Sequence, residues 1–382
     1  MNIAFLNSIE KNTYGGMEEW IRLVADGLNC RGHKVTLIGR KDSLFLKRVN
    51  KTNADFNIVE LNISGDFNPI TISEIRRQLA ENDIDILSVN FNKDVRIGGV
   101  AARLDNKVKI VWSLGLNITK NNIAHKIITP PLVDRVIVPS ESLKKEVIRY
   151  GYINKSIVDV IPIGIPYKLF DRPDNKAHMD LRKKLKLPDN SLIAVTTGRF
   201  VEHKGHDVLI KAAPKIINQF DNIYFLFLGD GPLENILKEM INELNIENRF
   251  IFAGMLENID MELSGSDIML HPSRIEPFGI AILEGMRAGL PIVASRVGGI
   301  PEVVSEGSNA VLVEPDNPET VALAVIKLLS DTDKMEKFGN EGRHRFRSLF
   351  LQEIMIDKVE KSFKSFFPND NCLCNSMEKN KK

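Results

Sequence analysis

Short apolar runs alternate with segments of helical periodicity along most of the chain. In the first half, the runs have the length and composition of buried strands. They fall at residues 2–6, 34–38, 58–61, 84–89, 109–111 and 135–138, and the first helical pattern covers residues 18–28. Alternation of strands and helices indicates a parallel sheet with crossover helices on both faces. The first half therefore predicts a doubly wound α/β domain.

The alternation is interrupted once and then resumes. Pro162, Pro166 and a polar stretch break the pattern in residues 158–175, as a linker does. Further strand-like runs follow at residues 192–196, 224–228, 250–252, 268–270, 292–294 and 310–313. We therefore expect two Rossmann-like domains, residues 1–168 and 169–351. An amphipathic helix at 352–367 and a polar, disordered tail at 368–382 complete the prediction.

Two open parallel sheets define where a ligand is expected. Ligands of such sheets bind in the crevice outside the carboxyl ends of the strands. Two sheet domains in one chain can bring two such edges together. We therefore expect the two domains to face each other across a cleft, and the chemistry to lie in it.

Composition and charge narrow the classes of function. The chain has 382 residues, 43% of them hydrophobic, and its 51 basic and 50 acidic residues leave a formal net charge of +1. This balance argues against nucleic acid as a partner, although a local basic patch stays open. The three cysteines form neither a disulfide framework nor a zinc motif. The apolar runs are too short for a signal peptide or a membrane span, so we expect a cytoplasmic protein.

Two glutamates bracket a predicted helix start in the second half. Gly279 and Ile280 begin this helix, whose free N–H groups and positive dipole end favour a phosphate. Glu284 lies one turn beyond and can reach a group attached to that phosphate, such as a ribose. Glu276 precedes the helix and suits the neutral hydroxyl groups of a sugar. The alternative stays open that Glu276 caps the helix and Glu284 is a solvated surface residue.

A pair of cations lies between another strand and its helix. Arg199 and Lys204 can reach the expected crevice, where two positive charges would offset a departing diphosphate. The alternative is an ordinary surface loop. His203 and His206 of the same segment are interpreted as loop structure, because no third ligand has the spacing of a metal site.

Glycines occur where a backbone must approach closely. Gly298 and Gly299 follow a strand, and the absence of side chains there permits such an approach. Gly15 and Gly16 follow the first strand, where a tight turn explains them equally well. Residues 229–232, Gly-Asp-Gly-Pro, are interpreted as a turn.

The motifs resemble the family four retaining glycosyltransferases of the GT-B fold. The resemblance covers the chain up to about residue 365 and is strongest between residues 192 and 330. It rests on Gly15-Gly16-Met17-Glu18, Gly198-Arg199, Lys204-Gly205, Gly229-Asp230-Gly231-Pro232, Pro272-Ser273, Glu276-Pro277-Phe278-Gly279, Glu284 and Gly298-Gly299.

The resemblance implies transfer of a sugar from a nucleotide-diphosphate donor to an acceptor hydroxyl, with retention of the anomeric configuration. It implies that the donor binds the second domain and that the acceptor, a glycan or a lipid-linked glycan, binds the first. It also implies that the last helix, 352–367, crosses back to the first domain. The implied catalytic residues are Glu276 on the sugar and Arg199 and Lys204 on the diphosphate. The implied donor-binding residues are Gly15, Gly16, Met255, Phe278, Gly279, Ile280 and Glu284.

One position departs from the family pattern. Many members carry a histidine after the strand that corresponds to residues 109–111, and Leu114 occupies that place here. The stretch Ser-Leu-Gly-Leu-Asn-Ile-Thr-Lys at 113–120 is similar to a subset of lipopolysaccharide-core transferases. This similarity implies an acceptor in a cell-envelope glycan.

No cofactor or divalent metal is implied. Asp83 and Asp85 superficially match a metal-binding carboxylate pair, but they are interpreted as a helix-to-strand turn. Residues 40–53 mix apolar and basic side chains, which suits a helix at the inner face of the cytoplasmic membrane. A solvated helix with one side toward the core is the alternative for that segment.

Two further functions stay open from the sequence: a nucleotide-sugar epimerase of the same fold, and a non-catalytic module that binds nucleotide sugars. A dehydrogenase is disfavoured, because no Gly-x-Gly-x-x-Gly turn follows the first strand.

Overall fold

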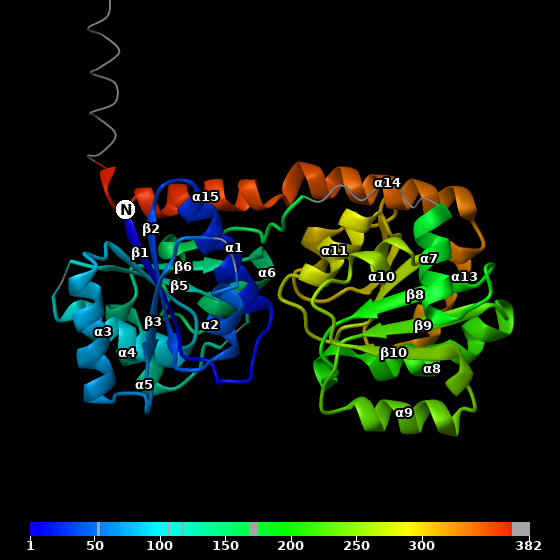
Figure 1. Ribbon diagram of the computed structural model, residues 1–382, viewed down its shortest axis with the longest axis horizontal. Coiled ribbons are helices and arrows are strands. Elements are labelled where there is room, and N and C mark those ends of the chain that lie inside the picture. Colours follow the sequence, from blue (N-terminus) through cyan, green and yellow to red (C-terminus); the bar gives the residue numbers. More distant parts are fainter. Residues whose placement is uncertain (52–53, 106, 117, 168–174, 369–382) are drawn as a thin grey trace, which may run out of the picture. The chain divides into compact units, whose positions relative to one another are not determined.

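The computed structural model describes all residues except 52–53, 106, 117, 168–174 and 369–382 (Figure 1). The chain divides into two compact units, which we treat separately. The N-terminal unit comprises Met1–Gly164 and the chain from Gln352 onward, and the C-terminal unit comprises Ile165–Leu351. The division falls inside the segment predicted as a linker. Most of the predicted tail, residues 368–382, lies outside the described residues.

The N-terminal unit is built on a parallel sheet with the strand order β3-β2-β1-β4-β5-β6-β7. The strands are β1 (Asn2–Asn7), β2 (Lys34–Arg40), β3 (Asn57–Leu61), β4 (Ile86–Val89), β5 (Lys109–Ser113), β6 (Arg135–Val138) and β7 (Val158–Val160). The central strands are almost wholly buried, because helices cover both faces of the sheet. This explains why they are continuous apolar runs rather than alternating patterns.

Helices connect these strands and cover the sheet (Figure 1). They are α1 (Gly16–Cys30), α2 (Leu44–Val49), α3 (Pro69–Glu81), α4 (Asn92–Arg103), α5 (Ile123–Ile128), α6 (Glu141–Ile148) and α15 (Gln352–Lys364), with short 3-10 turns at Pro130–Leu132 and Lys155–Ile157. α15 packs on α1 so closely that a Cβ added to Gly27 would lie 2.5 Å from Ile356. An ion pair of 2.8 Å between Arg31 and Glu360 holds the same contact.

β7 is a strand that the sequence pattern did not predict. It lies in the segment interpreted as a linker and pairs with β6 through Val136 and Val158. It is short and stands at the edge of the sheet, where the prolines that follow it remove no ladder hydrogen bond. The prolines thus end an edge strand rather than mark a linker throughout.

The basic segment 40–53 has apolar side chains that belong to the core. Within the described part of this segment, only α2 is helical, and Phe45 and Leu46 are 0% and 2% exposed. At these two positions the structure agrees with the alternative interpretation, a solvated helix with one side toward the core. Among the described residues, no helix is both long and apolar enough to cross a membrane.

The C-terminal unit repeats the architecture with the strand order β10-β9-β8-β11-β12-β13. The strands are β8 (Leu192–Thr197), β9 (Ile223–Leu228), β10 (Phe250–Gly254), β11 (Ile268–His271), β12 (Ile292–Ser295) and β13 (Ala310–Val313). The helices are α7 (Asn175–Leu185), α8 (His206–Gln219), α9 (Glu234–Glu243), α10 (Asp260–Ser264), α11 (Ile280–Ala288), α12 (Ile300–Val303), α13 (Pro318–Leu329) and α14 (Thr332–Leu349), with 3-10 turns at Glu202–Lys204 and Glu247–Arg249. Both units confirm the predicted fold class.

The strand orders fix where a ligand site is favoured in each unit. The order reverses between β1 and β4 in the N-terminal unit and between β8 and β11 in the C-terminal unit. Ligands of doubly wound sheets bind outside the carboxyl ends of the strands at such a switch point. The loops that follow these four strands are therefore the first places to look.

Candidate functional site

The loops after β8 and β11 pack directly on each other in the C-terminal unit. Gly205 has a φ of +68°, and a Cβ there would lie 2.1 Å from the carbonyl oxygen of Pro272. The backbone N–H of Arg274 donates to the carbonyl of His203 over 2.8 Å. Only glycine fits such a contact, so the Lys204-Gly205 motif allows the two loops to meet.

This contact brings Lys204 to Glu276. Lys204 Nζ lies 2.7 Å from Glu276 Oε2, and the two side chains are 22% and 9% exposed. Burial raises the pKa of Glu276, but the hydrogen bond from His271 and the Lys204 ammonium outweigh it and lower the pKa to about 2. Glu276 is therefore an ionised carboxylate that is almost fully withdrawn from solvent.

His271 is a member of this cluster that the sequence analysis missed. It ends β11 and is 2% exposed, and its Nε2 lies 2.9 Å from Glu276 Oε2 and 3.1 Å from Ser273 Oγ. An ionised carboxylate only accepts hydrogen bonds, so Nε2 must carry the proton that points to Glu276. His271 thus holds the carboxylate from the strand side, while Lys204 holds it from the facing loop.

Gly298 and Gly299 pack against the backbone of Glu276. The N–H of Gly299 donates to the backbone carbonyl of Glu276 over 3.0 Å. Gly298 has a φ of +52°, and a Cβ there would lie 2.1 Å from that carbonyl oxygen. The close backbone approach expected at this glycine pair is made by the Glu276 loop.

Arg199 extends from the loop after β8 and is exposed. Its loop rests on the segment 229–232, where a Cβ at Gly229 would lie 2.0 Å from the carbonyl oxygen of Gly198. The segment 229–232, which was expected to be a turn, therefore packs against the loop that carries Arg199. Met255, which follows β10, is 54% exposed.

The start of α11 lies directly beyond Glu276 in the chain. Gly279 is the N-cap and Ile280 is the first helical residue. Glu284 lies one turn further along the same helix. Phe278 is 3% exposed and packs against Phe350 with ring centroids 5.9 Å apart. Its side chain is therefore a core residue, and its contribution to a ligand would come from the backbone.

His206, the first residue of α8, belongs to the core of the C-terminal unit. His206 is 3% exposed and lies 5.0 Å from Phe200 and 5.6 Å from Phe227 between ring centroids. Burial, followed by the charges of His271 and Lys204, lowers the pKa of His206 to about 3. Within the part of the chain that the structure describes, His, Cys, Asp and Glu form no cluster of three that could hold a metal.

The glycine loop of the N-terminal unit is held by Glu18. Glu18 accepts hydrogen bonds from the N–H of Gly15 over 2.9 Å and from Asn7 Nδ2 over 3.0 Å. Gly16 is the first residue of α1, and Met17 follows it. Met17 lies against the end of β5, where a Cβ at Gly115 would be 1.9 Å from its sulfur. Gly15 and Gly16 thus lie in a different unit from the Glu276 cluster.

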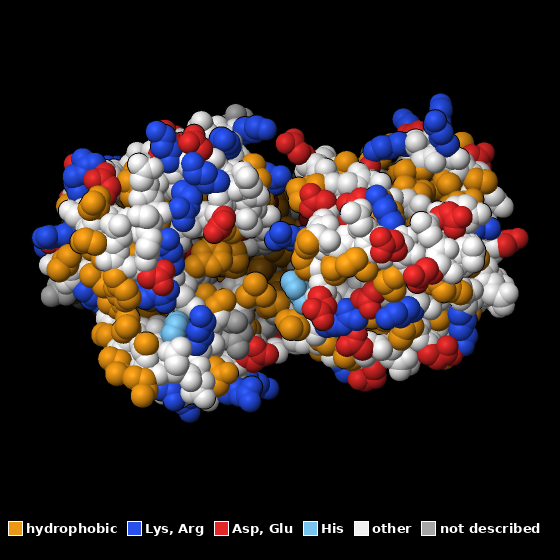
Figure 2. Space-filling view, turned by 90° about the horizontal axis from the view of Figure 1, so that it is seen from below, with side chains coloured by type: hydrophobic (Ala, Val, Ile, Leu, Met, Phe, Trp, Pro, Cys, Tyr) orange, Lys and Arg blue, Asp and Glu red, His pale blue; other side chains and the backbone are white. Residues whose placement is uncertain are grey.

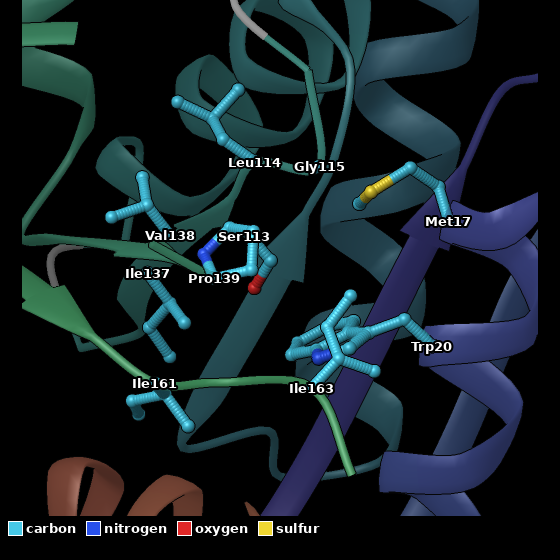
Figure 3. Close-up of a pocket in the computed structure, with 10 residues that line it drawn as sticks. All are labelled: Met17, Trp20, Ser113, Leu114, Gly115, Ile137, Val138, Pro139, Ile161 and Ile163. Atoms are coloured by element: carbon cyan, nitrogen blue, oxygen red, sulfur yellow. The ribbon is translucent and has the colours of Figure 1, made fainter. Parts of the chain in front are cut away.

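An apolar pocket opens beside this loop (Figure 3). Met17 and Trp20 of α1, Leu114 after β5 and Ile163 after β7 contribute to its wall, and none of the lining side chains is ionisable. Leu114 is 3% exposed, and its N–H donates to the carbonyl of Ile137 over 2.8 Å. Leu114, at the position where the family pattern has a histidine, therefore forms part of the apolar wall of this pocket.

Both halves of this chain match families of known proteins. Residues 178–345 match the family model described as Glycosyl transferases group 1, and residues 14–168 match that described as Glycosyltransferase Family 4. N-acetyl-alpha-D-glucosaminyl L-malate synthase of Bacillus anthracis is 28% identical over 347 residues, which are 86% of this chain and 88% of that protein.

Other relatives match over a shorter length. Lipopolysaccharide core biosynthesis glycosyltransferase LpsD of Rhizobium meliloti is 31% identical over 176 residues, 46% of this chain and 50% of that one. The chain spans about half the length of several curated relatives that it matches. The crystal structure of Anabaena HepE in complex with UDP and glucose has a TM-score of 0.82 at 21% identity, with coverage of 96% and 100%. This last likeness shows the fold.

Proposed function

Because the chain belongs to the glycosyltransferases of the GT-B fold, we propose that it transfers a sugar from a nucleotide-diphosphate donor to an acceptor hydroxyl with retention of configuration. The observation that carries this proposal is the buried, ionised Glu276 between Lys204 and His271, immediately before the start of α11. Removing a carboxylate from water costs free energy, and an ordinary surface loop or helix cap does not require this burial.

The proposed roles follow from the position of each group. The N–H groups at Gly279 and Ile280 and the charge of Lys204 bind the diphosphate, and exposed Arg199 adds a second cation. Glu284, one turn along α11, binds the ribose. Glu276 faces the sugar, where positive charge develops as the bond from the anomeric carbon to the diphosphate oxygen breaks.

In this reaction the leaving diphosphate takes the electron pair of the broken bond, and the acceptor oxygen forms the new bond to the anomeric carbon. The acceptor proton passes to the departing diphosphate. Two cations that neutralise the diphosphate make a divalent metal unnecessary in this proposal. We propose no cofactor.

The acceptor is proposed to be a glycan or lipid-linked glycan of the cell envelope. The name of the similar LpsD protein places that relative in lipopolysaccharide core biosynthesis, which supports this class. On the N-terminal unit, the pocket lined by Met17, Trp20 and Leu114 offers an apolar surface to the acceptor. Apolar walls suit the carbon-bound hydrogens of a sugar or the first part of a lipid chain.

Thermal unfolding with UDP, GDP or ADP in the presence of EDTA tests the donor site. One of the three nucleotides should raise the melting temperature by several degrees, because a ligand that binds only the native state stabilises it. Lys204→Gln should weaken that stabilisation, whereas Lys215→Gln, which removes an exposed cation paired with Glu319, should not. Stabilisation that vanishes in EDTA would refute metal independence.

Turnover separates the proposed transferase from the alternatives. A transferase releases free nucleotide diphosphate from the donor and forms a glycosylated product. An epimerase instead interconverts nucleotide sugars without a glycan acceptor, and a binding module shows stabilisation without turnover. Either of the latter outcomes would overturn the proposal.

A further inference from the structure

A second pocket lies at the edge of the C-terminal sheet opposite to the Glu276 cluster. Ala310, the first residue of β13, contributes to its wall, and so does Glu306 in the loop before that strand. The Glu276 cluster instead follows the carboxyl end of β11. Because β11, β12 and β13 are parallel, their amino ends share one edge of the sheet and their carboxyl ends share the other. The pocket is therefore separate from the proposed donor site.

Apolar side chains form the inner wall of this pocket. We refer to it as the β13 pocket, and its lining includes Ala310, Ala324, Lys327, Leu328, Lys334 and Phe338. Leu328 of α13 and Phe338 of α14 are each 1% exposed, and Ala310 is fully buried. The cavity measures about 190 Å³. An apolar cavity of roughly 150 Å³ admits a benzene molecule, so the β13 pocket has room for one ring or a branched chain of similar size.

Two lysines of the lining flank the turn between α13 and α14. Lys327 lies in the last turn of α13, and Lys334 lies in the first turn of α14. Lys334 Nζ is 5.3 Å from the centroid of the Phe338 ring, and this attraction holds the ammonium near the apolar wall. Within the described part of the chain, neither lysine forms an ion pair with a carboxylate. Glu306, the acidic residue of the lining, pairs with Arg296 over 2.5 Å, so the two ammonium groups have no countercharge in the pocket.

Charges elsewhere on this unit are mixed in sign. On the face of the C-terminal unit that Figure 2 shows, basic and acidic side chains lie interspersed. Exposed lysines of the unit have acidic partners, as in the ion pairs of Lys215 with Glu319 and of Lys238 with Glu234. The two lysines of the β13 pocket differ from these, because an apolar cavity rather than a carboxylate lies beside them.

We propose that the β13 pocket binds a small carboxylate whose body is apolar and about one ring in size. The body fills the cavity against Leu328 and Phe338, and the carboxylate contacts the ammonium groups of Lys327 and Lys334. Apolar walls strengthen such charge-assisted hydrogen bonds, because they exclude water. A nucleotide fits less well, since pockets for larger ligands begin at roughly 300 Å³. Neither the donor nor sugar transfer enters this proposal, so it holds or fails independently of the proposed function.

Titration with benzoate tests the β13 pocket, with saturation-transfer difference NMR as the readout. Benzoate should bind with a Kd on the order of 1 mM, as expected of a ligand of this size. Benzamide has the same shape without the charge and should bind about tenfold more weakly, because a hydrogen bond between two charged groups is lost. Benzylamine carries the opposite charge and should not bind.

Substitutions locate the binding. Lys327→Gln with Lys334→Gln should weaken benzoate binding at least about tenfold, since both charges that meet the carboxylate are removed. Ala324→Leu changes no charge but occupies part of the cavity, and Ala324 is half-buried, so the helix can accept the larger side chain. It should weaken the binding of benzoate and benzamide alike.

Lys215→Gln with Lys337→Gln is the matched control, because both residues are exposed lysines of the same unit outside the lining. This variant should bind benzoate as the unchanged protein does, and all variants should keep its far-ultraviolet circular dichroism and melting temperature. Absence of benzoate binding would overturn the proposal. So would equal losses in the two double variants, which would assign the binding to net charge.

The donor site is the competing location for benzoate. UDP, GDP and ADP should not displace benzoate, and Lys204→Gln should leave its Kd unchanged, because Lys204 lies in the Glu276 cluster at the other edge of the sheet. Displacement by a nucleotide, or loss of benzoate binding in Lys204→Gln, would assign the carboxylate to the donor site and overturn a separate β13 pocket.

Discussion

The two units present the same edge of the same fold with opposite chemistry. At the switch point of the C-terminal unit, a lysine, a histidine and an ionised glutamate lie within hydrogen-bonding distance and nearly out of solvent. In the N-terminal unit, the pocket beside the Gly15 loop is lined by apolar side chains and Ser113, and none of its lining side chains is charged. The fold thus supplies the position of a site, whereas the loops decide its chemistry.

The loops also differ in how they are held. In the C-terminal unit, Gly205 and Gly298 touch the backbone of neighbouring loops so closely that a Cβ does not fit. In the N-terminal unit, a Cβ added to Gly15 would be 3.6 Å from the nearest atom, the carboxylate of Glu18, which is ordinary contact. The charged site of the C-terminal unit is therefore fixed by backbone packing, whereas the glycine loop of the N-terminal unit is held by hydrogen bonds.

The largest expected effect tests whether the charged site carries the chemistry. Glu276→Gln should lower kcat by roughly a hundredfold or more, because a preorganised carboxylate beside developing positive charge stabilises the transition state. Glu284→Gln should mainly raise the KM for the donor, since the ribose changes little during reaction. Steady-state kinetics and nucleotide titration measure both. Normal kcat for Glu276→Gln, or equal loss of nucleotide binding in both variants, would contradict the separate roles.

Most of the strands and two residues of the charged site could be predicted from the sequence. Apolar runs of a parallel sheet are unambiguous because both faces are buried, so strands such as β1 and β12 were predicted within one or two residues. Glu276 and Lys204 were predicted as candidate site residues, since each follows a strand of the expected sheet, and the structure brings their side chains together. β7 was not predicted, because a run of three residues shortly before a proline is too short to show the pattern of a strand.

Other features could not be predicted because they depend on contacts distant in the chain. His271 reads as the end of a buried strand, and only the packing of the loops shows that it holds Glu276. The apolar character of residues 44–46 did not reveal which side faces the core. Phe278 matches a donor-binding motif, yet its ring packs on Phe350, far away in sequence.

A second prediction tests the backbone packing behind the carboxylate. Gly298→Ala places a Cβ 2.1 Å from the carbonyl oxygen of Glu276, so the glutamate must move. A displacement near 1 Å of a catalytic group costs up to about a hundredfold in rate. We therefore expect kcat to fall by somewhat less than in Glu276→Gln, with the KM for the donor little changed.

Gly307→Ala is the control for this substitution. Gly307 also has a positive φ, +75°, but a Cβ there meets nothing within 4 Å. Both variants carry the strain of an alanine in the left-handed region, about 1 kcal/mol, so both should lose a similar part of their stability to this cause. Equal activity in the two variants would show that backbone contact with Gly298 does not position Glu276.

The smallest expected effect is on the pH dependence of stability, which one buried ionisable group influences in each unit. In the C-terminal unit, burial holds the pKa of His206 at about 3. This value lies below that of the unfolded chain, near 6.5, so the unfolded state takes up a proton first as the pH falls. Its contribution to stability is present above pH 6.5 and is lost between pH 6.5 and 3, by about 2 kcal/mol at pH 5.

Asp94 of the N-terminal unit changes stability with pH in the opposite direction to His206. It is fully buried at the start of α4, and burial raises its pKa to about 6, although the N–H groups of Ser8 and Phe91 donate to its carboxylate. Because the folded pKa exceeds the unfolded one, near 3.9, its contribution to stability is present at low pH and is lost as the pH rises through about 6. Between pH 7 and 5 it should stabilise this unit by about 1 kcal/mol.

Acidification from pH 7 to 5 should therefore weaken the C-terminal unit through His206 and strengthen the N-terminal unit through Asp94. Amide hydrogen exchange, corrected for the intrinsic effect of pH, reports the stability of each unit separately. His206→Leu should remove the acid-induced loss of protection in α8 and β8, and Asp94→Asn should remove the gain in α4 and β4. A parallel response of both units in the unchanged protein, unaltered by either substitution, would mean that neither buried group sets the pH dependence and that the chemical contrast between the units does not extend to their stability.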